Sequence, residues 1–110
     1  MGPEDRLRVR HVLDAASEAV RFCAGRTQLD IETDRMLLLA VVRCIEIIGE
    51  AAGEVSLEFR AVTPEIPWRN MVAMRNRLIH GYFDVDPVIV WKTVTVELPG
   101  LIRRLGILME

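Results

Sequence analysis

Residue types that could perform chemistry concentrate in one segment, from Trp68 to Asp86, which reads WRNMVAMRNRLIHGYFDVD. No Asp or Glu occurs from Ile66 to Phe83, although acidic residues are frequent elsewhere. If this segment is helical, positions spaced by i, i+4, i+7 and i+11 form one stripe. The stripe consists of Arg69, Ala73, Asn76 and His80. An arginine, an amide and an imidazole therefore share one helix face beside a small residue.

This combination suits a phosphodiester. Histidine can take or give a proton near neutral pH. Arginine can stabilise the charge of a phosphorane-like transition state, and Arg75 and Arg77 lie beside the stripe. RNA supplies its own nucleophile, the 2′-OH, so its cleavage requires neither a metal nor a covalent enzyme intermediate.

We predict no metal site and no cofactor. The only other histidine, His11, is far from His80 in the sequence, and Asp84 and Asp86 lie beyond the end of the predicted helix. The two cysteines, Cys23 and Cys44, lack the spacing of a zinc site or a disulfide scaffold. We interpret them as buried thiols in a reducing cytosol.

The spacing of Arg75 and His80 poses a geometric difficulty. Five residues separate them by about 140° on an ideal helix, at roughly 100° per residue. Both side chains reach one site only if the helix end unwinds or if two chains contribute to it. A two-fold homodimer would bring two such helices together, and the apolar content of 51% is consistent with self-association.

The elements that would position these residues are all helical. A first helix is predicted to open at Pro3 and to end at Gly25, and its apolar stripe is Val9, Val12, Ala16, Ala19 and Cys23. A second helix, capped by Asp30 or Thr33, is predicted to run to about Gly53. It is apolar on most sides, with one polar stripe formed by Arg43, Glu46 and Glu50. Gly49 and Gly53 indicate tight packing against another helix.

The remaining chain predicts three further helices and one connector. Ser56 opens a short helix, and residues 63–67 form a connector because two prolines there forbid a regular helix. A third long helix runs from Pro67 or Trp68 to His80 and is stopped by Gly81. A fourth begins at Asp86-Pro87, with a kink or a break expected at Pro99-Gly100. Within it, Thr93–Val96 is the weakest helical segment because all four residues are β-branched.

These elements predict one domain, residues 1–110, with an all-α bundle of four long helices plus a short one. The formal net charge is −2, from 14 basic and 16 acidic residues, which excludes a polybasic coat for nucleic acid or membrane. The start is acidic, unlike a signal peptide, and the longest apolar run is too short to span a membrane. A cytoplasmic location without a membrane partner is expected.

Several motifs resemble the HepT-type ribonucleases of the HEPN domain family. Arg75-Asn76-Arg77-Leu78-Ile79-His80-Gly81-Tyr82 is similar to their Arg-x4-His-x-Tyr motif. Residues 45–52 (IEIIGEAA), 66–69 (IPWR) and 83–86 (FDVD), followed by Val90-Trp91 and Leu98-Pro99, also resemble the family. The likeness extends from about residue 5 to residue 105.

The resemblance implies a HEPN-type all-α dimer that acts as a metal-independent endoribonuclease. HepT proteins are the toxins of HepT/MNT (type VII) toxin–antitoxin pairs, in which MNT is a minimal nucleotidyltransferase. By matching positions, Arg75 and His80 are the catalytic pair, and Asn76 helps to place the phosphate. Tyr82 matches the tyrosine that the antitoxin modifies with AMP. We expect Arg69 and Arg77 to bind RNA, either tRNA or mRNA.

Three alternatives stay open. The chain could be a non-catalytic helical dimer that binds or scaffolds a nucleotidyltransferase, whereas a DNA-binding regulator is disfavoured by the negative charge and the lack of a recognition-helix pattern. Glu46 and Glu50 either hold Arg75 or Arg77, or form a solvated stripe. The two tryptophans either stack on bases or anchor the core, and we favour the core for both Trp68 and Trp91.

Overall fold

The computed structural model describes residues 1–80 and 85–110, with all side chains there except that of His80. Throughout these ranges the regular structure is helical and contains no strand. The elements are α1 (Pro3–Cys23), α2 (Gln28–Thr33), α3 (Arg35–Glu54), α4 (Leu57–Ala61), α5 (Trp68–His80), α6 (Pro87–Lys92), the π-helical turn η1 (Thr93–Glu97) and α7 (Leu98–Leu108). The expected all-α fold is confirmed.

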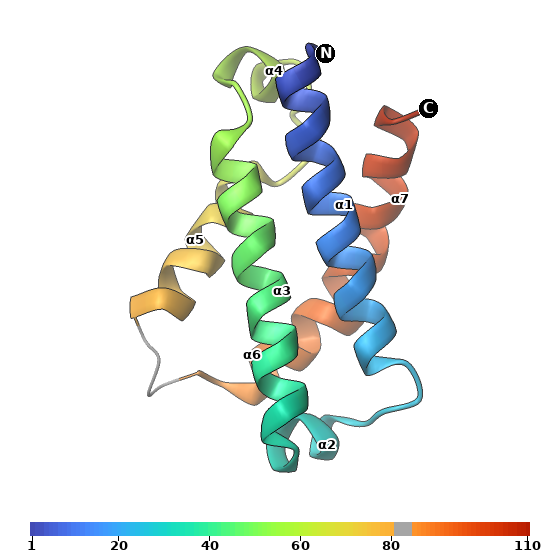
Figure 1. The fold of residues 1–110 in the computed structure, drawn as a ribbon, viewed down its shortest axis with the longest axis vertical. Coiled ribbons are helices and arrows are strands. Elements are labelled where there is room, and N and C mark those ends of the chain that lie inside the picture. The colour runs from blue at the N-terminus through green and yellow to red at the C-terminus, as the bar shows by residue number, and fades with distance from the viewer. Residues whose placement is uncertain (81–84) are drawn as a thin grey trace.

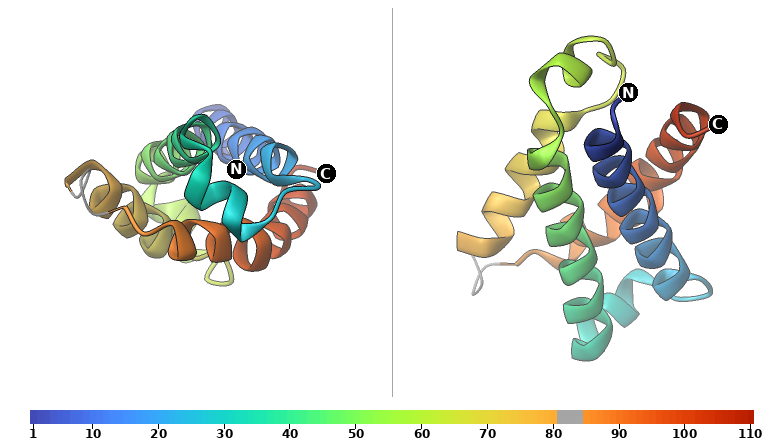
Figure 2. Two further views of the ribbon diagram at one scale, coloured as in Figure 1. Left: turned by 90° about the horizontal axis from the view of Figure 1, so that it is seen from below. Right: turned by 45° about the horizontal axis from the view of Figure 1, so that its top comes forward.

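Helix α3 is the centre of the arrangement (Figure 1). Helix α1 packs along one side of α3, and α5 packs along the other. The chain from α6 through η1 to α7 crosses behind α3 and reaches α1, as both views of Figure 2 also show. Within the described part of the chain, α3 is the one helix against which α5 packs extensively.

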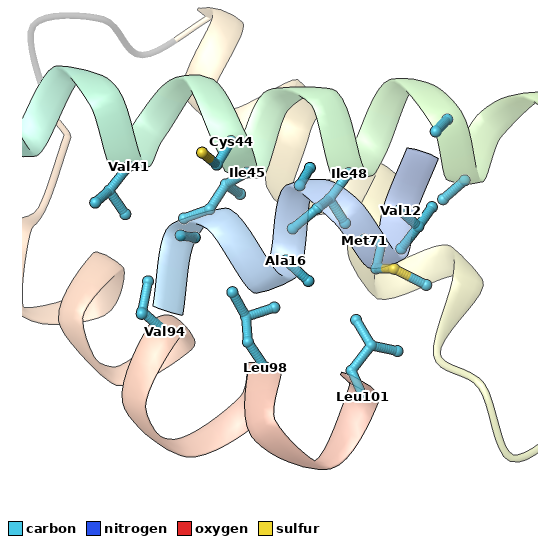
Figure 3. Packing of buried hydrophobic residues seen from close by; sticks show 14 of the residues in the cluster. Val12, Ala16, Val41, Cys44, Ile45, Ile48, Met71, Val94, Leu98 and Leu101 are labelled. Atoms are coloured by element: carbon cyan, nitrogen blue, oxygen red, sulfur yellow. The ribbon is translucent and has the colours of Figure 1, made fainter. Parts of the chain in front are cut away.

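The core lies where α1, α3 and the C-terminal helices meet (Figure 3). The predicted α1 stripe is buried in full, from Val9 to Cys23. Val41, Ile45 and Ile48 of α3 face this stripe and the C-terminal leucines, in agreement with a central apolar helix. Both cysteines are buried free thiols, as expected.

The predicted helix boundaries hold at most positions. Pro3 is the first residue of α1, the helix ends at Cys23, and Gly25, two residues later, adopts φ +72, a conformation that glycine tolerates best. Ser56 caps α4 and Asp86 caps α6 through side-chain acceptors. Helix α5 begins at Trp68 and extends to His80 as predicted, whereas the predicted stop, Gly81, lies outside the described residues.

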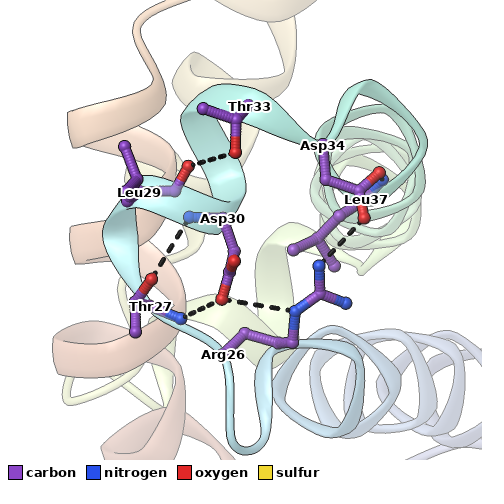
Figure 4. A network of polar contacts seen from close by, with 7 residues as sticks. All are labelled: Arg26, Thr27, Leu29, Asp30, Thr33, Asp34 and Leu37. Carbon is purple, nitrogen blue, oxygen red and sulfur yellow. Dashed lines mark hydrogen bonds and ion pairs between the residues drawn. The ribbon is translucent and has the colours of Figure 1, made fainter.

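The segment between α1 and α3 corrects the predicted cap. Neither Asp30 nor Thr33 caps the long helix, because both belong to the separate short helix α2. Thr27 and Asp30 form a reciprocal capping box on α2, and Asp34 caps α3 by accepting from the Leu37 amide at 3.1 Å. Arg26 joins both carboxylates, at 3.4 Å from Asp30 and 2.9 Å from Asp34 (Figure 4). The region between α1 and α3 therefore holds a short helix, α2, that was not expected.

The expected kink or break at Pro99-Gly100 is also corrected. Helix α7 contains both residues, and the departure from α-helical geometry lies one turn earlier, in η1. Pro99 has no N–H to offer the preceding turn. The Leu98 amide instead bonds to the carbonyl of Thr93, five residues back, and the wide turn keeps the chain helical. The weakest predicted segment, Thr93–Val96, falls within this π-helical turn.

Candidate active site

Helix α5 is held against α3 by one edge. Trp68, Met71 and Leu78 are buried along this edge, and the indole Nε1 of Trp68 donates to Thr63 Oγ1 at 3.0 Å. A Cβ at Gly49 of α3 would overlap the Arg75 side chain, so the absence of a side chain at Gly49 lets the two helices approach. The core role favoured for Trp68 is confirmed, and Trp91 packs partly buried against the same core.

The guanidinium of Arg75 is fixed between two partners. Its Nη1 donates to the Asn76 side-chain oxygen at 3.0 Å, and its Nη2 lies 3.8 Å from Glu50 Oε1. The Nε atom is buried and has no hydrogen-bond partner among the described residues. The side chain is 34% exposed, so the outer edge of the guanidinium stays accessible to an anion.

The two glutamates of the α3 stripe have different roles. Glu50 faces Arg75 and also lies 3.7 Å from Arg43, whereas Glu46 pairs with Arg43 at 3.5 Å. Of the two interpretations that the sequence allowed, the holding role therefore applies to Glu50. Arg43 and Arg75 lie near the same Glu50 oxygen, Oε1, so the charge of Arg43 offsets part of the negative charge beside Arg75.

Arg75 also lines a shallow hollow of about 490 Å³ that the sequence did not reveal. Its other lining residues come from α1 and α3 and are Arg8, His11, Ile47, Glu50, Ala51 and Glu54. His11, which we set aside as remote in the sequence, is thus brought to the same hollow as Arg75. The one signal in the sequence is that Arg8 and His11, three residues apart, form a polar stripe on α1 next to the stripe of the buried Val9 and Val12.

The opposite flank of α5 faces a cleft of about 630 Å³ against η1 and α7. Asn70, Ala73 and Arg77 line the cleft from α5, and Arg104 lines it from α7. Arg69, Ala73 and Asn76 are exposed, as the predicted stripe required. Arg77 therefore lies at this cleft, away from Arg75, and Arg69 lines neither hollow.

His80 ends helix α5, and its side chain lies outside the described part, as does the whole of Tyr82. Because α5 is helical from Trp68 to His80, positions 75 and 80 are about 140° apart at roughly 100° per residue. The structure thus orients Arg75 toward α3 and leaves the two motif positions on different sides of one helix.

Metal-ligand groups and membrane-spanning helices are both absent from the described residues. Among residues 1–80 and 85–110, no three His, Cys, Asp or Glu side chains are grouped as metal ligands would be. None of the helices in these ranges combines the length and apolar character that crossing a bilayer requires. Helix α5 carries the Arg75 guanidinium held by two partners, the neighbouring Asn76 amide, and the His80 position about one turn further on.

Comparisons with known proteins identify the family. The model of the family described as HepT-like ribonucleases (Ribonuclease HepT-like) matches residues 12–106. The chain belongs to the HepT-like ribonuclease family. A relative from Thermococcus cleftensis, named "Probable ribonuclease HepT", is 47% identical over 72 residues, which cover 66% of each chain.

Two other relatives match over more of the chain at lower identity. A Methanocaldococcus jannaschii protein, named provisionally as an RNase, is 34% identical over 87% of this chain and 88% of its own. A protein of Caldanaerobacter subterraneus subsp. tengcongensis, named in the same way, is 33% identical over 93% of this chain and 91% of its own. No solved structure matches the chain significantly. The family match and these relatives identify the protein as a ribonuclease.

The HepT-like match includes all of α5 and the motif that follows it, whereas Arg8 and His11 lie before residue 12, where the match begins. The hollow beside Arg75 is thus built partly from residues outside the matched segment.

Proposed function

We propose that this HepT-like ribonuclease is a metal-independent endoribonuclease toxin, with Arg75 and His80 as its catalytic pair. The observation that supports this most directly is the fixed Arg75 guanidinium, held by Asn76 and Glu50 on the helix that ends at His80. A guanidinium held in place is prepared to stabilise charge on a phosphate without reorganising at the moment of reaction.

In the proposed reaction, His80 takes the proton from the 2′-OH of the RNA, and O2′ attacks the adjacent phosphorus. The P–O5′ bond breaks, and a proton passes to the leaving oxygen. The products are a 2′,3′-cyclic phosphate and a 5′-OH end. The reaction needs no oxidant and no metal, and it forms no covalent enzyme intermediate. Arg75 stabilises the negative charge of the phosphorane-like transition state, while Asn76 and the exposed Arg69 help to place the RNA.

The helical separation of positions 75 and 80 supports a composite site in a two-fold dimer. Each site would combine Arg75 of one chain with His80 of the other. Mixing the Arg75→Ala and His80→Ala variants tests this, because a hybrid dimer would contain one intact site and one site that lacks both residues. Partial recovery of cleavage on mixing is expected. If the mixture stays inactive although the two variants exchange subunits, each site lies within one chain and the composite site is wrong.

The direct test is cleavage of tRNA and of a generic mRNA in the presence of EDTA. His80→Ala is expected to lower the rate by about 10²–10⁴-fold, and Arg75→Ala by about 10²–10³-fold. Arg35→Ala is the matched control, because Arg35 is exposed at the start of α3, far along that helix from Gly49. Equal cleavage by all variants, or cleavage that EDTA abolishes, would contradict the proposal.

Regulation by a minimal nucleotidyltransferase antitoxin is the second part of the proposal. Tyr82 is the only tyrosine, so transfer of AMP to tyrosine has one target in this chain. A bulky anionic nucleotide two residues after His80 would repel RNA from the site. Incubation with such a transferase and ATP should add one adenylyl group and stop cleavage. Tyr82→Phe should stay active and unmodified, and inhibition of Tyr82→Phe would contradict this mechanism.

A further inference from the structure

The cleft between α5 and the C-terminal helices combines an apolar interior with helices rich in arginine. Its walls, α5 and α7, carry five arginines and no Asp or Glu, although the whole chain has a net charge of −2. The arginines are Arg69, Arg75, Arg77, Arg103 and Arg104. Of these five, Arg77 and Arg104 line the cleft itself, together with Glu65 and Glu97 from outside the two helices, whereas Arg75 lines the other hollow.

The interior of the cleft is apolar. Ile45 and Ile48 of α3, Met71 of α5, and Leu98 and Leu101 of α7 form its floor, and all five are largely buried (Figure 3). The polar residues of its lining are Asn70, Arg77, Arg104, Thr93, Glu65 and Glu97. A volume of about 630 Å³ lies within the range of small-molecule sites, about 300–1,000 Å³. An apolar floor below a polar rim suits a planar base attached to a charged group.

Arg104 is oriented toward this rim. Its Nη1 donates to the backbone carbonyl of Glu65 at 3.5 Å, and its guanidinium forms no ion pair with any of the described residues. Arg77 lies on the opposite wall, three residues before His80 and thus about 4.5 Å along the helix axis at roughly 1.5 Å per residue. The cleft therefore runs toward the end of α5 where cleavage is proposed.

We infer that this cleft is a nucleotide subsite for the RNA strand that flanks the cleaved bond, an inference that rests on the proposed ribonuclease site. The base lies on the apolar floor, and the adjoining phosphates contact Arg77 and Arg104. Only an unstacked base can enter, so the subsite selects single-stranded RNA over a duplex. Arg104 is the residue that this inference adds, since its distance from the motif gives no sign of a role in RNA binding.

Binding of a 2′-O-methylated RNA oligonucleotide tests the subsite without cleavage, because this RNA lacks the attacking hydroxyl. Fluorescence anisotropy of the labelled oligonucleotide would compare wild type with Arg104→Glu and Arg77→Glu. Each reversal is expected to weaken binding by about tenfold or more, and to reduce the salt slope by about 0.7 per lost phosphate contact. The matched control is Arg35→Glu, since Arg35 is exposed and an acidic residue suits a helix N-terminus.

The outcomes separate this inference from the proposed function. Loss of RNA binding in Arg104→Glu, with an unchanged circular dichroism spectrum and intact binding by Arg35→Glu, supports the subsite even if the wild type cleaves no RNA. Wild-type binding and His80-dependent cleavage in both reversals would overturn the subsite and leave the ribonuclease proposal standing. A change in dimer association measured by sedimentation, with unaltered RNA binding, would assign the cleft to a contact between copies and would also overturn it.

Discussion

Gly49 of α3 lies directly beneath the side chain of Arg75 on α5. A Cβ built at Gly49 would overlap the Arg75 side chain and would come within 2.8 Å of the Met71 carbonyl oxygen. This close approach sets the distance of the Arg75 guanidinium from α3. It keeps the guanidinium within 3.8 Å of Glu50, the residue after Gly49. The geometry of the candidate site thus depends on a residue that carries no functional group.

The first prediction follows from this contact. Gly49→Ala should force α5 away from α3, lower the free energy of unfolding by about 1–3 kcal/mol, and reduce cleavage by displacing Arg75. Gly53→Ala is the control, because a Cβ there would meet Val72 Cγ2 at an ordinary 3.8 Å and should stabilise the helix by up to about 1 kcal/mol. Urea unfolding and cleavage rates measure both effects. Equal stability of the two variants would contradict this view of the packing.

The second prediction concerns how Arg75 is oriented. Glu50→Gln removes the charged partner 3.8 Å from Arg75, and a half-exposed pair of this kind contributes at most about 1 kcal/mol. Cleavage should therefore fall by no more than about fivefold, with KM and the pH profile of the His80 step little changed. Glu46→Gln is the matched control, since Glu46 pairs with Arg43 and not with Arg75. A larger loss in Glu46→Gln than in Glu50→Gln would be inconsistent with these contacts.

The third prediction concerns the thiols. Burial, together with the carboxylate of Glu18 at 3.5 Å from its Sγ, raises the pKa of Cys44 to about 12, and burial raises the pKa of Cys23. Because the thiolate is the reactive form, iodoacetamide at pH 8 should leave both thiols of the folded protein unmodified over minutes. The same reagent in urea should label both. Intact mass reads the outcome, and rapid labelling of Cys44 in the folded protein would refute the assignment.

The fourth prediction concerns acid stability. Hydrogen bonds from Arg26 and from the Leu37 amide lower the pKa of Asp34. The carboxylate is therefore preferred in the folded state, and its contribution to stability is present above the unfolded pKa of about 3.9 and lost as the pH falls through the lower folded value. Asp34→Asn keeps the cap acceptor but loses the charge, so its Tm should lie below that of wild type at pH 7.

The pH series provides the check on Asp34. As the pH falls below about 4 and through the lowered folded pKa of Asp34, the two Tm values should converge, because the wild-type carboxylate becomes protonated over this range. Asp14→Asn is the control, since Asp14 is exposed and lies 3.8 Å from Arg10 in an ordinary i, i+4 pair. A Tm difference for Asp34→Asn that does not change between pH 7 and pH 3 would show that the charge is not what stabilises this junction.

Local signals in the sequence were sufficient for most helix boundaries. Pro3, Ser56 and Asp86 act within one helical turn of their own positions, so their side-chain chemistry can be recognised without tertiary information. The start of α3 was missed because Asp30 and Asp34 are equally good caps, and only the folded chain shows that Asp30 belongs to the capping box of α2. At Pro99 the sequence indicated a disturbance, but its form, a wide turn one step earlier, depends on the packing of both neighbouring segments.

Some features of the candidate site could likewise be predicted from local sequence, and others could not. The exposed stripe of α5 and the separation of Arg75 from His80 follow from helical periodicity, which the sequence contains. The hollow beside Arg75 requires α1 and α5 to flank α3, and the cleft requires α7 to cross behind it. No local pattern specifies these placements, so His11 and Arg104 acquire their neighbours only through the tertiary fold.

Because α5 is attached to α3 by a single edge, its residues differ in how freely they can be substituted. Trp68, Met71 and Leu78 carry the contact with the rest of the fold, so most changes there are costly. Asn70, Ala73 and Arg77 point away from it, where substitutions seldom affect folding. Under the inferred nucleotide subsite, single replacements at these positions can therefore change which RNA is preferred while the packing of α5 on α3 is kept.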